Sequence, residues 1–195
     1  KNVDSIEERN QMFQYLEAYI MRRMIVRASS KNYNQLFTDR LIQNEILTKT
    51  QLEDYLTEIN DKYNYMPADE EIERGFHNSV LTNKQAAGIL YLIESSIRNR
   101  SRQSTKLLGI SKYSLEHLMP KKWENKWDKL DTKELVDKRN FRLRTLGNLA
   151  IITQSLNSSI RDSDWQTKKN GAKGKEGLKH YSGGIETLAS FLVLC

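Results

Sequence analysis

The feature that most limits the fold of this chain is a repeated helical pattern over its first hundred residues. Polar residues that can cap a helix are followed by apolar residues three or four positions apart, and no strand-like alternation occurs there. Three pairs have the spacing of a capping box: Ser5 with Glu8, Thr50 with Glu53, and Thr82 with Gln85. The sequence therefore predicts a helical bundle in this half.

The apolar positions predict which helix faces are buried. Pro67 is expected to start a short helix over 69–76. The other expected stripes are Phe13, Leu16, Ile20 and Met24; Tyr33, Leu36, Phe37 and Leu41; Leu52, Tyr55, Leu56, Ile59 and Tyr63; and Ala86, Ile89, Leu90, Ile93 and Ile97.

The pattern changes after residue 99, where a polar, basic stretch begins. Strand-forming residues then occupy 113–118 and 149–153, a helix is predicted over 155–169, and a last helix after Gly183-Gly184. We therefore predict a mainly α (α+β) chain, with a helical subdomain over 1–105 and a subdomain that contains a small two-stranded sheet over 106–195.

Charge is distributed unevenly along the chain. The formal net charge is +6, and the stretch from Arg98 to Arg144 holds fourteen Lys or Arg against six acidic residues. Between Glu53 and Glu73, eight acidic residues stand against Lys62 alone. A basic segment favours phosphate binding, although a solvated helix face can have the same composition.

Composition also limits the protein class. The single cysteine, Cys195, leaves no internal disulfide and no cysteine-rich zinc site, so a bound metal would use oxygen and imidazole ligands. No apolar run reaches the roughly 20 residues of a membrane span, and no signal peptide is recognisable. We expect a cytoplasmic protein without a membrane partner. Because the chain starts without Met and stops inside an apolar pattern, we expect a fragment of a longer protein.

Residues able to perform chemistry surround the two predicted strands. His117 follows Glu116 near the end of the first strand, and an imidazole is a natural base for activating water. Asn148 enters the second strand, where its amide can hydrogen-bond to loop backbone and orient the histidine. Asn157, early in the next helix, can join Glu116 as an oxygen ligand of Mg²⁺.

Each of these residues also has a simpler interpretation. The histidine can be packed or capping, Asn148 a turn residue and Asn157 a solvent-facing helix position. The three tryptophans are expected in the core rather than stacked on bases. Arg22-Arg23 can contact DNA, or can lie exposed or buried and paired while holding the two halves together.

Three segments in this order resemble the C-terminal domain of GmrSD-type restriction endonucleases, which are HNH, or ββα-metal, nucleases. YSLEHLMPKKW is similar to the family's His-aliphatic-x-Pro segment, RLRTLGNLAIIT to its Gly-Asn-Leu strand, and SLNSSIRDSDWQTKK to its asparagine-containing helix ending in lysine. Upstream, YLEAYIMRRMIVRASSKNYNQLF resembles the helical Arg-Arg segment that precedes the nuclease core, so the likeness covers nearly the whole chain.

The resemblance implies an HNH-type core surrounded by helices, which cuts DNA with one divalent metal, Mg²⁺ or Mn²⁺, and no other cofactor. In this interpretation His117 activates water, Asn148 braces the loop, and Glu116 and Asn157 hold the ion. Many HNH enzymes have histidine where this chain has Asn157. Phosphate contacts are expected from Lys121, Lys122, Arg142, Arg144, Lys168 and Lys169.

The resemblance also implies partners: double-stranded DNA, in particular modified phage DNA, and a ParB-related, nucleotide-using N-terminal domain or subunit outside this chain. The expected function is nicking or cleavage of modified foreign DNA in restriction or phage defence, in the bacterial cytoplasm. Two alternatives stay open: a non-catalytic basic DNA-binding module, and a helical protein-interaction domain.

Overall fold

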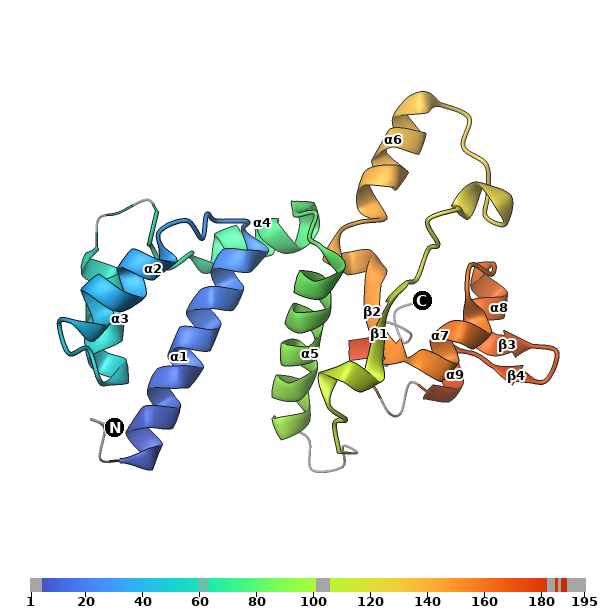
Figure 1. Ribbon diagram of the computed structural model, residues 1–195. Helices are drawn as coiled ribbons and strands as arrows, with labels where there is room; N and C mark the ends of the chain where they lie inside the picture. The colour runs from blue at the N-terminus through green and yellow to red at the C-terminus, as the bar shows by residue number, and fades with distance from the viewer. Residues whose placement is uncertain are drawn as a thin grey trace. The chain divides into compact units, whose positions relative to one another are not determined.

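A computed structural model describes residues 5–59, 61, 63–100, 106–181, 185, 187 and 188. The chain divides into two compact units, Lys1–Ser79 and Val80–Cys195. The described residues are mostly helical and form two small antiparallel sheets, which confirms the mainly α class (Figure 1). The subdomain boundary expected at residue 105 adjoins residues 101–105, outside the described residues, and stays a prediction.

The first unit is helical in all its described elements. Its helices pack their apolar sides around a core of Tyr19, Leu36, Leu41, Leu52 and Leu56. The elements are α1 (Ile6–Ile25), α2 (Tyr33–Gln35), the π-helical η1 (Leu36–Ile42), α3 (Lys49–Glu58) and α4 (Asp69–Asn78).

The caps of these helices agree with the sequence in one case and differ in another. The Ser5 hydroxyl accepts a hydrogen bond from the Glu8 N–H at 3.3 Å, as predicted. The third helix is instead capped by Thr48 and Gln51, whose side chains each bind the other's backbone N–H. The predicted box at Thr50 is therefore wrong, and α3 ends at Glu58 rather than near Tyr63.

The first helix buries the predicted face only in part, since Leu16 and Ile20 pack against the core. Phe13 is 58% exposed, whereas Tyr19 and Arg23 are fully buried. The Arg23 guanidinium donates to the carbonyl oxygens of Ser29 at 2.6 Å and Tyr65 at 3.0 Å, and to that of Tyr63. Arg23 therefore holds a loop of its own unit and is not available to DNA.

Arg22 anchors the same loop. Its Nε donates to the Pro67 carbonyl at 2.9 Å, and its Nη2 pairs with Asp69. The described partners of Arg22-Arg23 all lie in the first unit, so the pair secures that unit.

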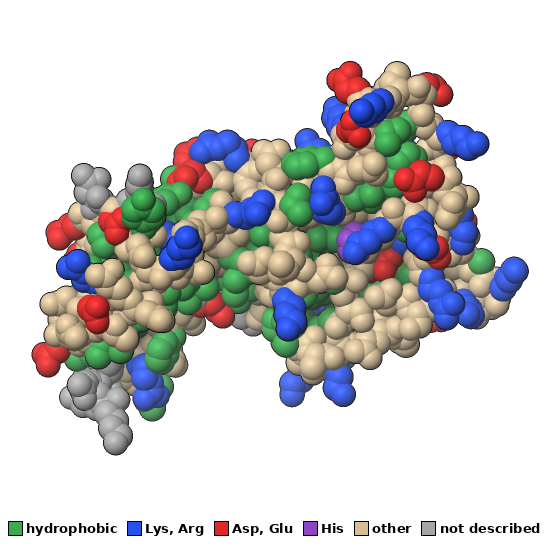
Figure 2. Space-filling view, turned by 45° about the horizontal axis from the view of Figure 1, so that its top comes forward, with side chains coloured by type: hydrophobic (Ala, Val, Ile, Leu, Met, Phe, Trp, Pro, Cys, Tyr) green, Lys and Arg blue, Asp and Glu red, His purple; other side chains and the backbone are tan. Residues whose placement is uncertain are grey.

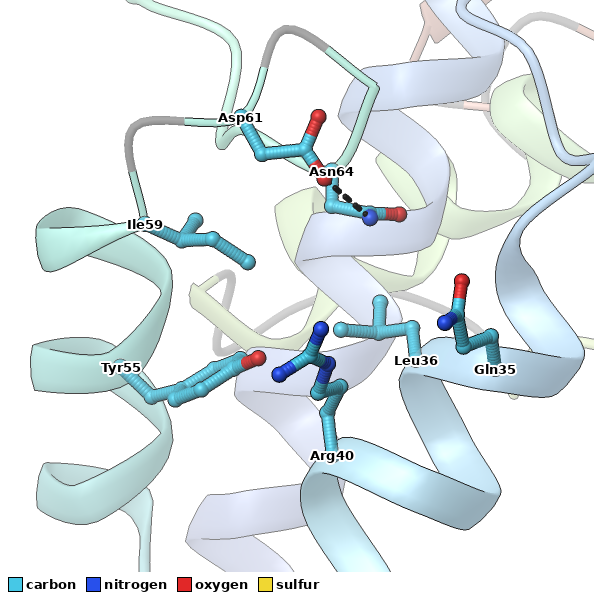
Figure 3. A pocket seen from close by; sticks show the side chains of 7 residues that line it. All are labelled: Gln35, Leu36, Arg40, Tyr55, Ile59, Asp61 and Asn64. Atoms are coloured by element: carbon cyan, nitrogen blue, oxygen red, sulfur yellow. Dashed lines mark hydrogen bonds between the residues drawn. The ribbon is translucent and has the colours of Figure 1, made fainter.

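A cavity of about 200 Å³ lies in the first unit beside this loop (Figure 3). The Asn64 Nδ2 donates to Asp61 Oδ2 at 2.7 Å across its upper edge, and Tyr55 and Arg40 reach into it from two helices. Among described residues, Asn64 Oδ1 is buried without a hydrogen-bond partner. The rim of this cavity is therefore polar, unlike the apolar core nearby.

The second unit is built on a pair of strands, β1 (Tyr113–His117) and β2 (Leu149–Thr153), at the predicted places. The strands are antiparallel, with Glu116 opposite Ala150 and His117 opposite Leu149. Helices α5 (Asn83–Arg100) and α7 (Gln154–Ile160) both contact these strands (Figure 1). The remaining elements are α6 (Lys133–Arg142), α8 (Trp165–Asn170), β3 (Gly171–Ala172), β4 (Lys175–Glu176), α9 (Leu178–Tyr181) and the short 3₁₀ turns at Ile110–Lys112, Trp123–Asn125 and Leu146–Asn148.

Helix α5 begins at the predicted cap, because the Thr82 hydroxyl accepts from the Gln85 N–H at 3.3 Å. Its buried face departs from the predicted stripe in the last turns, where Ile97 is 37% exposed. Glu94 and Arg98 are buried there instead, 2.6 Å apart, and Glu94 also accepts from Thr187. A buried ion pair thus replaces apolar packing at this end of α5.

The helix predicted over 155–169 is in fact two helices. Arg161 ends α7 with a positive φ of 40°, and Asp164 then caps α8 by accepting from the Thr167 N–H at 2.9 Å. The predicted last helix, which starts after Gly184, falls mainly on 186 and 189–195, outside the described residues. Of its described positions, Ile185 and Leu188 are buried in the core of this unit.

No helix among the described residues combines the length and apolar character required to cross a membrane.

Candidate functional site

The centre of the candidate site is the loop that follows β1, and hydrogen bonds from Asn148 hold this loop in place. The Asn148 Oδ1 accepts from the Met119 N–H at 2.8 Å, while its Nδ2 donates to the carbonyls of Met119 at 3.0 Å and Leu143 at 3.1 Å. Its backbone carbonyl accepts from the Leu118 N–H at 2.9 Å. The hydrogen bonds to loop backbone that we expected of Asn148 are therefore present. They fix the loop directly after His117.

His117 is the last residue of β1 and is half-buried. Burial, followed by the positive charges of Lys121 and Lys168, lowers its pKa from 6.5 to about 4. The imidazole is therefore neutral at pH 7, which is the form that accepts a proton.

Glu116 and His117 belong to opposite faces of the strand, because side chains alternate along a β-strand. Glu116 shares its face with Ala150, which packs in the core with Leu156 and Ile160 of α7. Only 6% of Glu116 is exposed. Glu116 is therefore directed toward the interior and α7.

A lysine lies against this buried carboxylate. Lys168, from α8, is fully buried, pairs with Glu116 through its Nζ, and donates to the His117 carbonyl oxygen at 2.7 Å. Burial raises the pKa of Glu116, and Lys168 opposes that shift. The ammonium therefore neutralises the residue that we expected to bind a metal.

This arrangement also revises the role expected for Lys168. A fully buried ammonium with two protein acceptors does not reach a DNA phosphate in this conformation. The ion pair joins residues 52 positions apart in sequence. The sequence contains no local signal for it, apart from a lysine one turn after the start of a helix.

The fit of a divalent ion can be judged from the donors present. Glu116 and the partly buried Asn157 of α7 supply oxygen atoms, which are the ligands that Mg²⁺ prefers. The described residues contain no group of three His, Cys, Asp or Glu that could hold a metal. The donors are thus right in kind, but one of them already binds Lys168.

Exposed basic residues flank the loop in sequence. Figure 2 shows Lys and Arg side chains close to a histidine on the face shown. The expected phosphate contacts that are exposed are Lys121, Lys122, Arg142 and Arg144. Lys169 is partly buried, with its Nζ 5.8 Å from the centre of the Trp165 ring.

The tryptophans contribute to packing beside this site. Trp123 is 2% exposed, and its indole N–H donates to Asn140 at 2.9 Å. Trp127 and Trp165 are partly buried, with ring centres 6.3 Å apart. The core position that we predicted for the tryptophans is confirmed for Trp123, and Trp165 packs against the core of this unit as well as pairing with Trp127.

Comparison with known proteins gives one match. Residues 66–182, more than half of the chain, match the family model of the C-terminal domain of GmrSD restriction endonucleases. The upstream segment at 15–37, for which we expected the same likeness, lies outside the matched range, so that part of the resemblance stays a prediction. No curated protein and no solved structure matches the chain. The match includes β1, β2, α7 and α8, and the chain belongs to the family of GmrSD restriction endonuclease C-terminal domains.

Proposed function

We propose that this chain is a metal-dependent DNA endonuclease domain of the HNH type, in which β1, β2 and α7 form the ββα core. One observation carries the proposal: a neutral imidazole, His117, stands at the end of β1 on a loop fixed by Asn148. Hydrolysis of a phosphodiester needs such a base to take a proton from water. Membership of the restriction endonuclease family supports the same substrate.

The roles of the residues follow from their positions. His117 accepts a proton from water, the water oxygen attacks phosphorus, and the bond to the leaving oxygen breaks. Asn148 maintains the loop geometry through its three amide hydrogen bonds. Glu116 and Asn157 are the residues that would hold Mg²⁺ or Mn²⁺. When bound, the ion supplies positive charge at the phosphate and the leaving oxygen.

DNA binding is assigned to the exposed cations of the second unit. Lys121, Lys122, Arg142 and Arg144 contact backbone phosphates, together with the partly buried Lys169. Contacts of this kind position a duplex without reading its sequence. Lys168 is left out of this set because it is buried.

The wider setting is proposed from the family alone. In this proposal, the chain works with a ParB-related, nucleotide-using domain or subunit and acts on modified foreign DNA, such as phage DNA, in the bacterial cytoplasm.

One observation favours a second candidate function. Because Lys168 neutralises Glu116, the chain can also be a DNA-binding module that retains the nuclease shape without cutting. Plasmid nicking in Mg²⁺ or Mn²⁺, with EDTA as the control, separates the two. We expect metal-dependent nicking; steeply salt-dependent DNA binding without nicking would favour the second function. Absence of DNA binding at low salt would contradict both.

A further inference from the structure

Lys168 connects three parts of the candidate site through one buried atom. Its side chain leaves α8 and ends at the last two residues of β1, where Nζ binds the Glu116 carboxylate and the His117 carbonyl. An ammonium has three N–H donors and no acceptor. Two of the three are therefore directed to the strand end that carries the proposed base.

The base of the lysine is also fixed. Asp164 caps α8 by accepting from the Thr167 N–H at 2.9 Å and from the Thr167 hydroxyl at 2.6 Å. Trp165, in the same first turn of α8, packs against Trp127. These contacts hold α8, so the lysine acts as a rigid strut between α8 and β1 rather than as a mobile surface cation.

We infer that Lys168 is a positioning residue which fixes the end of β1 and occupies, with its ammonium, the cation position at Glu116. This inference rests on the proposed function, in which Glu116 is a metal ligand. A buried carboxylate requires a positive partner, and the lysine supplies it. A divalent ion at the same carboxylate meets the charge of Lys168 at close range. Lys168 and the metal therefore compete for Glu116.

Competition between Lys168 and the metal predicts a result that a purely structural role of Lys168 does not predict. Removal of the ammonium leaves the Glu116 carboxylate without a cation, so metal affinity rises even though the fold loses a buried ion pair. If Lys168 only supports the fold, its removal lowers the melting temperature and leaves metal affinity unchanged.

The experiment measures Mn²⁺ binding to the full chain without DNA, by electron paramagnetic resonance of the free ion. The variant is Lys168→Met, which keeps the length of the side chain and removes its charge. Lys168→Arg keeps the charge, and the exposed Lys175→Met is the matched control for loss of one positive charge. We expect Lys168→Met to bind Mn²⁺ on the order of 10-fold more tightly than the unaltered chain. Lys168→Arg and Lys175→Met should stay near the unaltered affinity.

The double variant Lys168→Met with Glu116→Gln should lose the gain, because it lacks the carboxylate. Equal affinity of Lys168→Met and the unaltered chain, including no binding by either, overturns the inference, as does a gain that persists in the double variant. Neither outcome depends on DNA cleavage, so failure of this inference is distinguishable from failure of the proposed function.

A second measurement needs no variant and covers the case in which Lys168→Met does not fold. Nitrogen-15 NMR of lysine ammonium groups should resolve the buried Lys168 Nζ, since burial slows its proton exchange. Saturating Mg²⁺ should shift or remove this signal. An unchanged Lys168 signal at saturating Mg²⁺ overturns the competition.

Discussion

The two units each bury a cation completely, but they use it differently. In the first unit the charge of Arg23 is shared among carbonyl oxygens and lies over the rings of Tyr19 and Tyr33. In the second unit Lys168 concentrates its charge on one carboxylate beside the proposed base. Arginine's planar group suits several acceptors, whereas lysine's compact ammonium suits one site. The first cation therefore holds a loop, and the second neutralises a functional group.

The largest expected effect is on the stability of the second unit. Lys168→Met should lower the free energy of unfolding by about 4 kcal/mol, because it leaves a buried carboxylate without its partner. Combining it with Glu116→Gln should recover most of the loss. Urea unfolding followed by tryptophan fluorescence reports this unit, since all three tryptophans lie in it. If the double variant is no more stable than Lys168→Met, the unpaired Glu116 carboxylate is not the cause of the lost stability.

Arg23→Met should cost somewhat less, about 3 kcal/mol, because its carbonyl partners lose a charged donor. Arg23→Lys should recover only part of the loss, since an ammonium cannot match the spread of acceptors. Circular dichroism at 222 nm, which reports helices of both units, is the measurement. Full recovery by lysine would remove the contrast between the two cations.

Asn148→Ala should lower the free energy of unfolding by about 2 kcal/mol, because the loop loses three hydrogen bonds. Asn148→Asp should not restore stability, since a carboxylate cannot donate to the Met119 and Leu143 carbonyls. Tryptophan fluorescence in urea again serves as the readout. Wild-type stability in Asn148→Asp would mean that the donor half of the amide is dispensable.

A further expected effect is a pH dependence of stability. The pKa of His117 in the folded chain is about 4, below its ordinary 6.5, so the unfolded chain takes up the proton first as pH falls. The contribution of His117 to stability is complete above pH 6.5 and is lost progressively down to about pH 4. The melting temperature should therefore fall less steeply over this window in His117→Gln than in the unaltered chain. Parallel curves would contradict the depressed pKa.

The sequence predicted the elements whose signals are local. The strand at 149–153 and the caps at Ser5 and Thr82 are found as predicted, because short-range periodicity and capping chemistry determine them. Thr48 rather than Thr50 caps α3. The sequence does not distinguish the two threonines, because each has a suitable residue three positions later. Asp164 was missed as the cap of α8, although its spacing to Thr167 carries the signal.

The site was predictable only in part, for a physical reason. The hydrogen bonds of Asn148 follow from its place in a turn beside a neighbouring strand. The pairing of Lys168 with Glu116, and the burial of Arg23, depend on how distant segments pack. A lysine near the end of a basic helix has the same sequence appearance whether it faces solvent or a buried carboxylate.

The central claim is that His117 is the general base of a nuclease in the second unit. Its most direct test is single-turnover nicking of plasmid already bound to the protein in Mn²⁺, comparing the unaltered chain, His117→Ala and the exposed-histidine control His180→Ala. We expect His117→Ala to bind DNA equally well and to nick it on the order of a thousand-fold more slowly, and His180→Ala to nick at the unaltered rate. Equal nicking rates for His117→Ala and the unaltered chain would contradict the claim.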